Sequence, residues 1–240
     1  MFTFGQYDSI YGKPLIVLKE DDPWSIDEFS NIPEFIMYEN GQIIYRKVEN
    51  KHTKIYEVTL NKEELQQVIK HLSIEESFYK LENSFLISNT TCNASTYLVL
   101  NFDSIRRIKV EIIGDLLNRN ERSNAPKELL TLYNKLINYK SSKAKEWLPN
   151  NIEVIFWKNN SAVNKKAWLQ GFPDLNTSII KIIENTEYYS VFFDKKYFKE
   201  FEKYYSSLTQ DEAIEINGKQ MSIYFKFPVP NMDSFYNDLN

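Results

Sequence analysis

Two Asn-Gly dipeptides, each placed between apolar runs, constrain the fold of this chain more than any other feature. Asn40-Gly41 lies within 35–45, and Asn217-Gly218 lies within 214–224. Both residues of such a pair tolerate positive φ, which a two-residue type I′ turn requires. The pattern therefore predicts two tight β-hairpins and, with them, antiparallel sheet.

Alternating apolar and polar residues predict further strands. In 97–113, the apolar residues Ile108, Val110 and Ile112 alternate with charged ones, which indicates a third hairpin that turns near Asp103-Ser104. Additional strands are predicted by the apolar runs 15–18, 55–60, 152–157 and 188–193.

Four amphipathic helices are also predicted. Asn61 and Glu64 form a capping-box pattern at the start of the first, and Ser73 and Glu76 repeat the pattern for a short second helix. A third is expected over 126–139, with proline in its first turn. Asp194 is expected to cap a fourth, whose apolar face consists of Phe198, Phe201, Tyr204 and Tyr205.

Hairpins combined with segregated helices predict an α+β fold with a mainly antiparallel sheet. We expect one compact unit over 1–240, with sub-lobes 1–142 and 146–240 as the alternative. That alternative rests on a weak repeat, because 56–62 and 189–195 align with three identities, and it places the join in 141–145. A common strand–cap–helix unit is the simpler explanation of the repeat.

The residues that bind cofactors and metals are scarce. The chain has 6 glycines, no two of them closer than seven positions, so it lacks the clustered glycines of a phosphate-binding loop. Two histidines and one cysteine are too few for a Cys/His zinc site. The acidic run Glu20-Asp21-Asp22 lacks the spacing of a calcium loop. We therefore predict no cofactor and no metal.

No catalytic residue is assigned from the sequence. Cys92 and His71 would form a nucleophile–base pair only if the fold brought them within hydrogen-bond distance. Any of the 33 acidic residues could also pair across the fold. The sequence thus favours a protein that is not an enzyme, and a hydrolase that uses dispersed carboxylates or the Cys92/His71 pair is kept as the alternative.

Charge is unevenly distributed along the chain. Residues 1–40 hold two lysines against eight acids, whereas 41–240 holds 27 basic and 25 acidic side chains. Binding to nucleic acid needs a basic stripe that neutralises phosphates, and none is visible. We predict no nucleic-acid partner.

The most distinctive segment is 19–29, in which acids surround one tryptophan. An aromatic anchor ringed by carboxylates suits a basic protein partner. The predicted partner-binding residues are Glu20, Asp21, Asp22, Trp24, Asp27 and Glu28. Alternatively, Trp24 turns inward and closes the core, which is the more common fate of a tryptophan.

A second aromatic surface is predicted around Trp157, Trp168 and Phe172. The alternative here is a strand end and a loop packed by their own aromatic side chains.

The start of the sequence has no signal-peptide pattern, and no apolar run is long enough to span a membrane. Lysine outnumbers arginine 24 to 5 and asparagine occurs 24 times, a composition often seen in AT-rich bacterial genomes. We therefore expect a cytoplasmic bacterial protein.

These observations favour a binding protein, with an immunity-type protein that occludes a basic toxin as its concrete form. A self-associating structural protein with an aromatic homodimer face is the third hypothesis.

Overall fold

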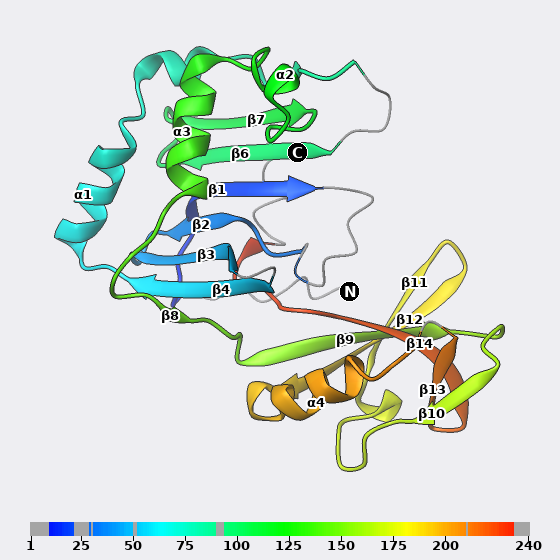
Figure 1. Cartoon of the computed structure of the whole chain (residues 1–240). Coiled ribbons are helices and arrows are strands. Elements are labelled where there is room, and N and C mark those ends of the chain that lie inside the picture. Colours follow the sequence, from blue (N-terminus) through cyan, green and yellow to red (C-terminus); the bar gives the residue numbers. More distant parts are fainter. Residues whose placement is uncertain are drawn as a thin grey trace. The chain divides into compact units, whose positions relative to one another are not determined.

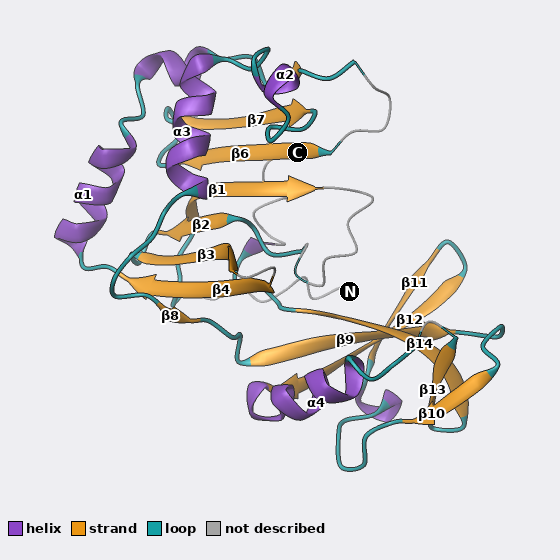
Figure 2. Cartoon of the chain, in the orientation of Figure 1, coloured by secondary structure: helices purple, strands orange, loops and turns teal. Residues whose placement is uncertain are grey.

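The computed structural model describes residues 10–21, 29, 31–49, 52–89, 94–209 and 211–232. These residues contain fourteen strands and four α-helices (Figures 1 and 2). Because most strand pairs are antiparallel, the structure confirms the predicted α+β class.

The chain divides into two units. The first comprises residues up to Trp147 together with those from Val229 onwards, and the second spans Leu148–Pro228. The predicted linker 141–145 lies inside the first unit, where it reaches the start of strand β8 (Lys145–Glu146). The chain therefore leaves the first unit after Trp147 and returns to it at Val229.

The first unit is built on an eight-stranded sheet of order β5-β7-β6-β1-β2-β3-β4-β8. Its other strands are β1 (Pro14–Asp21), β2 (Phe35–Tyr38), β3 (Gln42–Glu49), β4 (His52–Thr59), β5 (Ser84–Leu86), β6 (Ser95–Asn101) and β7 (Arg107–Ile113). All neighbouring strands run antiparallel except β5 and β7. The predicted hairpin over 97–113 is confirmed as β6–β7.

Three helices belong to this unit: α1 (Lys62–Leu72), the short α2 (Arg119–Arg122) and α3 (Lys127–Ile137). The predicted capping box of α1 is confirmed, because Asn61 Oδ1 accepts a hydrogen bond from Glu64 N at 2.9 Å and Glu64 Oε2 accepts one from Asn61 N at 3.0 Å. Pro126 was predicted in the first turn of α3, but it is the N-cap residue, one position before the helix begins at Lys127.

Both faces of the central strands are buried. Leu18, Phe35 and Met37 belong to the hydrophobic core that also contains Leu129 and the other buried residues of α3. Alternate residues point to the opposite face, where Val17, Ile36, Ile44 and Val99 are also fully buried. Hydrogen bonds from Tyr38 Oη to Pro230 O and from Asn231 Nδ2 to Gly12 O help to attach the segment from Val229 onwards to this unit.

The second unit is built on a six-stranded sheet of order β10-β13-β14-β9-β12-β11. Its strands are β9 (Asn151–Lys158), β10 (Asn164–Ala167), β11 (Ile179–Ile183), β12 (Thr186–Asp194), β13 (Glu212–Ile216) and β14 (Lys219–Lys226). The central strand β9 pairs Phe156 with Tyr189 of β12 and with Ile223 of β14.

One face of this sheet is covered by α4 (Phe198–Tyr205). Phe201 is fully buried, with its ring 5.1 Å from that of Phe193 and 5.4 Å from that of Phe225. The predicted cap is confirmed, because Asp194 Oδ1 accepts a hydrogen bond from Lys196 N at the start of the 3₁₀ turn η3 (Lys195–Tyr197), which continues into α4.

The predicted capping box at Ser73 is wrong. Ser73 is the left-handed residue that ends α1, with φ 53°, and its hydroxyl donates to the carbonyls of Lys70 and His71. The short 3₁₀ helix η1 (Glu76–Lys80) begins after Glu75 without a side-chain cap. Polar residues such as serine occur both at the end of a helix and at the start of one, so the local pattern did not show which role Ser73 has.

The two Asn-Gly hairpins form, but with different turns. Asn217 and Gly218 both have positive φ, 49° and 71°, which confirms the type I′ prediction. At the first hairpin the prediction is wrong, because Gly41 has positive φ (88°) and Asn40 does not. There the loop has three residues, and a Cβ on Gly41 would lie 2.3 Å from the carbonyl oxygen of Leu60.

Candidate functional site

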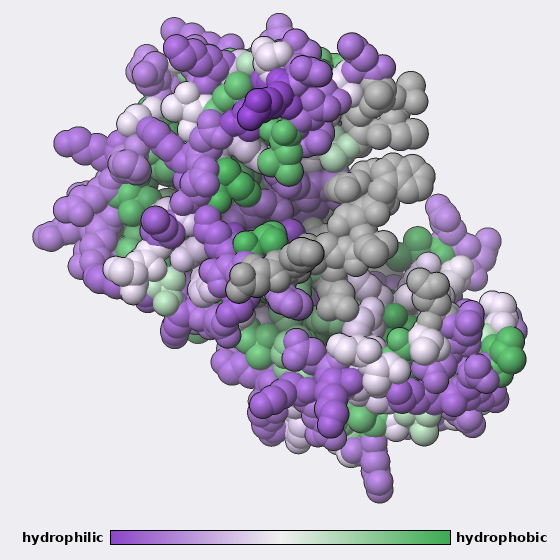
Figure 3. Space-filling model, in the orientation of Figure 1, coloured by the Kyte–Doolittle hydropathy of each residue, from purple (hydrophilic) through white to green (hydrophobic). Residues whose placement is uncertain are grey.

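The edge strand β11 exposes apolar side chains along its whole length. Its sequence is Ile179-Ile180-Lys181-Ile182-Ile183, and the isoleucines are 54%, 55%, 71% and 56% exposed. Hydrophobic surface is visible where this hairpin projects from its sheet (Figure 3). An exposed apolar strand at a sheet edge can pair with another chain.

The pairing of β11 with β12 shows on which face of the sheet each side chain of β11 lies. It pairs with β12 on one side, with Ile180 opposite Tyr189 and Lys181 opposite Tyr188, and no other described strand pairs with it. Tyr189 lies on the face that α4 covers, together with Phe193, so Ile180 and Ile182 belong to that face. Ile179, Lys181 and Ile183 point to the opposite face.

The hairpin turn determines which backbone groups face outwards. Glu184 and Asn185 have φ values of 48° and 65°, typical of a two-residue type I′ turn. The residues that flank such a turn, Ile183 and Thr186, form a hydrogen-bonded pair, and hydrogen bonding alternates along the strand. The N–H and C=O groups of Ile180 and Ile182 therefore point away from β12, towards the open edge.

The other sheet edges differ from β11. β5 has three residues and β8 has two, and β10 has the sequence Asn-Lys-Lys-Ala. Short or lysine-rich edges discourage pairing with other chains. β11 has a single lysine among four isoleucines, and within the described residues Lys181 forms no ion pair.

The structure separates the residues of the predicted second aromatic surface. Trp168 packs beside Phe156, Phe172 and Phe201 on the α4 face, and its indole N–H donates to Pro173 O. Trp157 follows Phe156 in β9, so it points to the opposite face, where it lies beside Tyr188. All three predicted residues are half-buried.

Most of the predicted acidic docking segment, including Asp22, Trp24, Asp27 and Glu28, lies outside the described residues. Glu20 and Asp21 end strand β1. Asp21 is exposed and lies 3.5 Å from Lys19 Nζ. Glu20 is half-buried, and its Oε1 accepts a hydrogen bond from Tyr133 Oη of α3 at 2.8 Å.

A second carboxyl group is buried beside Glu20. Glu34 is 4% exposed, its Oε2 accepts a hydrogen bond from Glu20 N at 2.5 Å, and its Oε1 lies 3.3 Å from Arg46 Nη1 without hydrogen-bond geometry. Burial raises the pKa of Glu34 to about 7, which Arg46 opposes and Glu20 reinforces. Burial, with Glu20 nearby, also raises the pKa of the Tyr133 hydroxyl.

Arg46 connects the Glu34 carboxyl group and its neighbour Glu20 to the segment of the same chain that precedes β2. Its Nη1 donates to Phe29 O at 2.9 Å and to Ile32 O at 3.2 Å. The guanidinium therefore donates hydrogen bonds to two backbone carbonyls and also forms an ion pair with the Glu34 carboxylate. This pattern is typical of a cation that organises a buried polar region.

The proposed Cys92/His71 pair is not tested, because Cys92 lies outside the described residues. His71 lies in the last turn of α1 and is exposed. It lines a groove of about 750 Å³ between α1 and α3, together with Glu64, Lys135 and Lys143. Lys135 and Lys143 already have partners there, since Lys135 Nζ donates to the carbonyls of His71 and Leu72 and Lys143 pairs with Glu64.

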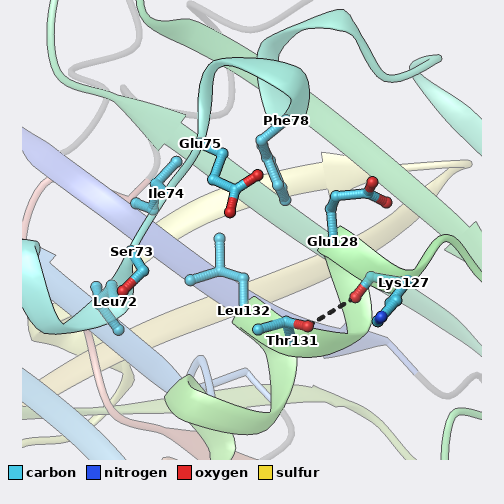
Figure 4. Close-up of a pocket in the computed structure, with 9 residues that line it drawn as sticks. All are labelled: Leu72, Ser73, Ile74, Glu75, Phe78, Lys127, Glu128, Thr131 and Leu132. Carbon is cyan, nitrogen blue, oxygen red and sulfur yellow. Dashed lines mark hydrogen bonds between the residues drawn. The ribbon is translucent and has the colours of Figure 1, made fainter.

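A smaller cavity of about 230 Å³ lies between α3 and the segment that follows α1 (Figure 4). Glu75 and Glu128 come from its two sides, and Thr131 Oγ1 donates to the Lys127 carbonyl within α3. Glu20 and Glu34 line neither this cavity nor the groove beside His71. In the described residues, no three His, Cys, Asp or Glu side chains gather as metal ligands.

Sequence reasoning missed β11 and the Glu34–Arg46 pair. A strand could have been predicted over 179–183, because the run is rich in isoleucine and precedes an asparagine turn. No local signal marks Glu34 as buried, since its partners Glu20 and Arg46 come from β1 and β3.

Comparison of the chain with protein families, curated proteins and solved structures finds no match. Among the described helices, none combines the length and the apolar character needed to cross a membrane.

Proposed function

We propose that this chain is a protein-binding protein, and that β11 accepts an extended strand from another protein chain at its open edge. The observation that carries the proposal is the exposure of four isoleucines on one edge strand. In strand addition, main-chain hydrogen bonds provide affinity and alternate side chains provide specificity. β11 offers both, through the outward backbone groups of Ile180 and Ile182 and through isoleucines on both faces.

Acid–base catalysis by Glu34 and Glu20 is the second candidate. A carboxyl group with a pKa of about 7 suits a general acid or base near neutral pH. Glu34 is almost fully buried, however, and such a residue must reach its substrate. Binding is therefore the better-supported function.

An immunity-type role against a basic toxin stays a prediction. The acidic segment that motivates it lies mostly outside the described residues, and Glu20 directs its carboxylate to Tyr133. The proposal of strand addition at β11 does not depend on that segment.

A displayed library of random peptides of about ten residues, long enough to span an edge strand, tests the proposed function. Selected peptides should bind the wild-type chain, and the double variant Ile180→Lys/Ile182→Lys should weaken them by roughly tenfold or more. The control is Val163→Lys, an 86% exposed residue of the same unit outside β11, which should bind as the wild type does. Failure to select any peptide, or equal binding by the double variant, would contradict the proposal.

A further inference from the structure

We infer that the strand accepted by β11 is β11 of a second copy of this chain, paired antiparallel across a two-fold axis at Lys181. This inference rests on the proposed function and names its partner. A two-fold interface uses the same patch on both subunits, so the patch must be complementary to itself.

The sequence of β11 has the required symmetry. Ile179-Ile180-Lys181-Ile182-Ile183 reads the same in both directions around Lys181. In an antiparallel pair centred there, Ile179 lies opposite Ile183 of the second copy, and Ile180 lies opposite Ile182. Every isoleucine thus faces an isoleucine. Shifting the two-fold axis to Ile180 or Ile182 leaves one such pair and places lysine opposite isoleucine.

The backbone favours the same register. The outward N–H and C=O groups belong to Ile180 and Ile182. With the axis on Lys181, Ile180 of each copy can therefore exchange hydrogen bonds with Ile182 of the other. Lys181 then forms the non-hydrogen-bonded pair on the axis. An axis on Ile180 or Ile182 would form one hydrogen-bonded pair within β11 instead of two, so backbone and side chains both favour the axis on Lys181.

Lysine opposite lysine is the unfavourable contact of this arrangement. Like charges directly opposite each other destabilise a strand pair, whereas isoleucines that face each other remove apolar surface from water and stabilise it. Four isoleucine pairs oppose one lysine pair, so self-pairing is favoured. The surrounding edge is exposed, and salt should therefore strengthen the dimer by screening the two ammonium groups.

The contact area limits the strength of this dimer. Five residues of each chain bury less than the roughly 1,200–2,000 Å² of a stable interface. We therefore expect a weak, reversible dimer that dissociates on dilution, with a Kd between about 10 µM and about 1 mM.

Sedimentation equilibrium of the full chain over a concentration series measures this association. The wild-type chain should shift from monomer to dimer, and Ile182→Lys should weaken the dimer by roughly tenfold or more. Val163→Lys should keep the wild-type Kd, which controls for an added surface charge. Circular dichroism of both variants confirms that they fold.

Mixing with a charge-reversal variant identifies the register. In a mixture of wild type with Lys181→Glu, lysine of one copy would face glutamate of the other on the axis. With one component labelled with ¹⁵N, native mass spectrometry should show heterodimer in excess of the half expected from random mixing. A random distribution would overturn the register centred on Lys181.

The outcomes separate the two proposals. A chain that stays monomeric but binds selected peptides through β11 overturns this inference and leaves the proposed function standing. A chain that neither dimerises nor binds peptides overturns both. A dimer that Ile182→Lys does not weaken forms elsewhere, and also overturns the inference.

Discussion

One site in each unit of this chain departs from ordinary burial, and the two sites depart from it in opposite ways. The first unit buries the ionisable side chain of Glu34, which directly precedes β2, with Arg46 of β3 and Glu20 of β1 beside it. The second leaves four isoleucines of β11 exposed to solvent. Buried polar groups and exposed apolar patches are the informative exceptions to the usual sorting of residues.

The buried carboxyl group and the exposed strand should affect different properties of the chain, namely its stability and its association with other chains. A buried carboxyl group acts on the free energy of folding, because its charge state depends on whether the chain is folded. An exposed apolar strand contributes little to the stability of the isolated unit, and it acts when another strand covers it. Substitutions at Glu34 and Arg46 should therefore change stability, and those on β11 should change association.

The largest stability effect is expected from Arg46→Met. Removing the guanidinium leaves Glu34 and two backbone carbonyls without their cation, and breaking a buried pair in this way costs about 3–5 kcal/mol. The measurement is the free energy of unfolding in urea. Lys54→Met, which breaks an exposed pair with Glu146 at 3.0 Å, is the control and should have little effect. Equal effects of the two variants would contradict the role of the buried pair.

The next effect is a dependence of stability on pH. The pKa of Glu34 is raised from 4.5 to about 7 in the folded chain, so folding takes up a proton between these values. The free energy of unfolding should therefore decrease as the pH rises from about 4.5 to about 7, by about 3 kcal/mol at about 1.4 kcal/mol per unit.

Glu34→Gln should remove most of that pH dependence, whereas Glu63→Gln, on the exposed side of α1, should retain the wild-type profile. The comparison uses urea unfolding at a series of pH values. Parallel profiles for Glu34→Gln and the wild type would show that Glu34 does not titrate in this range.

The smallest of these effects is expected at the Asn-Gly dipeptides, of which each unit contains one. Gly41→Ala should destabilise the chain by roughly 2–3 kcal/mol, because it adds a collision with the Leu60 carbonyl to the strain of positive φ. Gly218→Ala meets no atom within 4 Å and should cost about 1 kcal/mol from strain alone. Thermal unfolding measures both, and a larger loss for Gly218→Ala would contradict the close approach at Gly41.

Much of the local structure could be predicted from sequence because its causes lie within a few residues. The capping box of α1 needs Asn61 and Glu64, and the turn at 217–218 needs two residues that tolerate positive φ. The error at Ser73 is also local in origin, whereas the error at Gly41 is not. Ser73 ends a helix with the same chemistry that could begin one, and Gly41 is constrained by Leu60, which approaches from outside the hairpin.

The candidate sites were harder to predict because they depend on distant residues. Trp157 and Trp168 are close in sequence, but strand alternation and the position of α4 place them on opposite faces of the sheet. A strand over 179–183 has a local signal, whereas its position at the edge depends on the order of six strands.

The sequence by itself determined the α+β class, the hairpins and the caps at Asn61 and Asp194, since each follows from backbone preferences and hydrogen bonds between near neighbours. The tertiary structure alone decided that the Glu34 carboxyl group is buried and that β11 has an open edge. Glu20 meets Tyr133 across 113 positions, and β11 is exposed because the strands of its sheet all lie on its other side. Such contacts arise from packing between elements, which no short sequence pattern records.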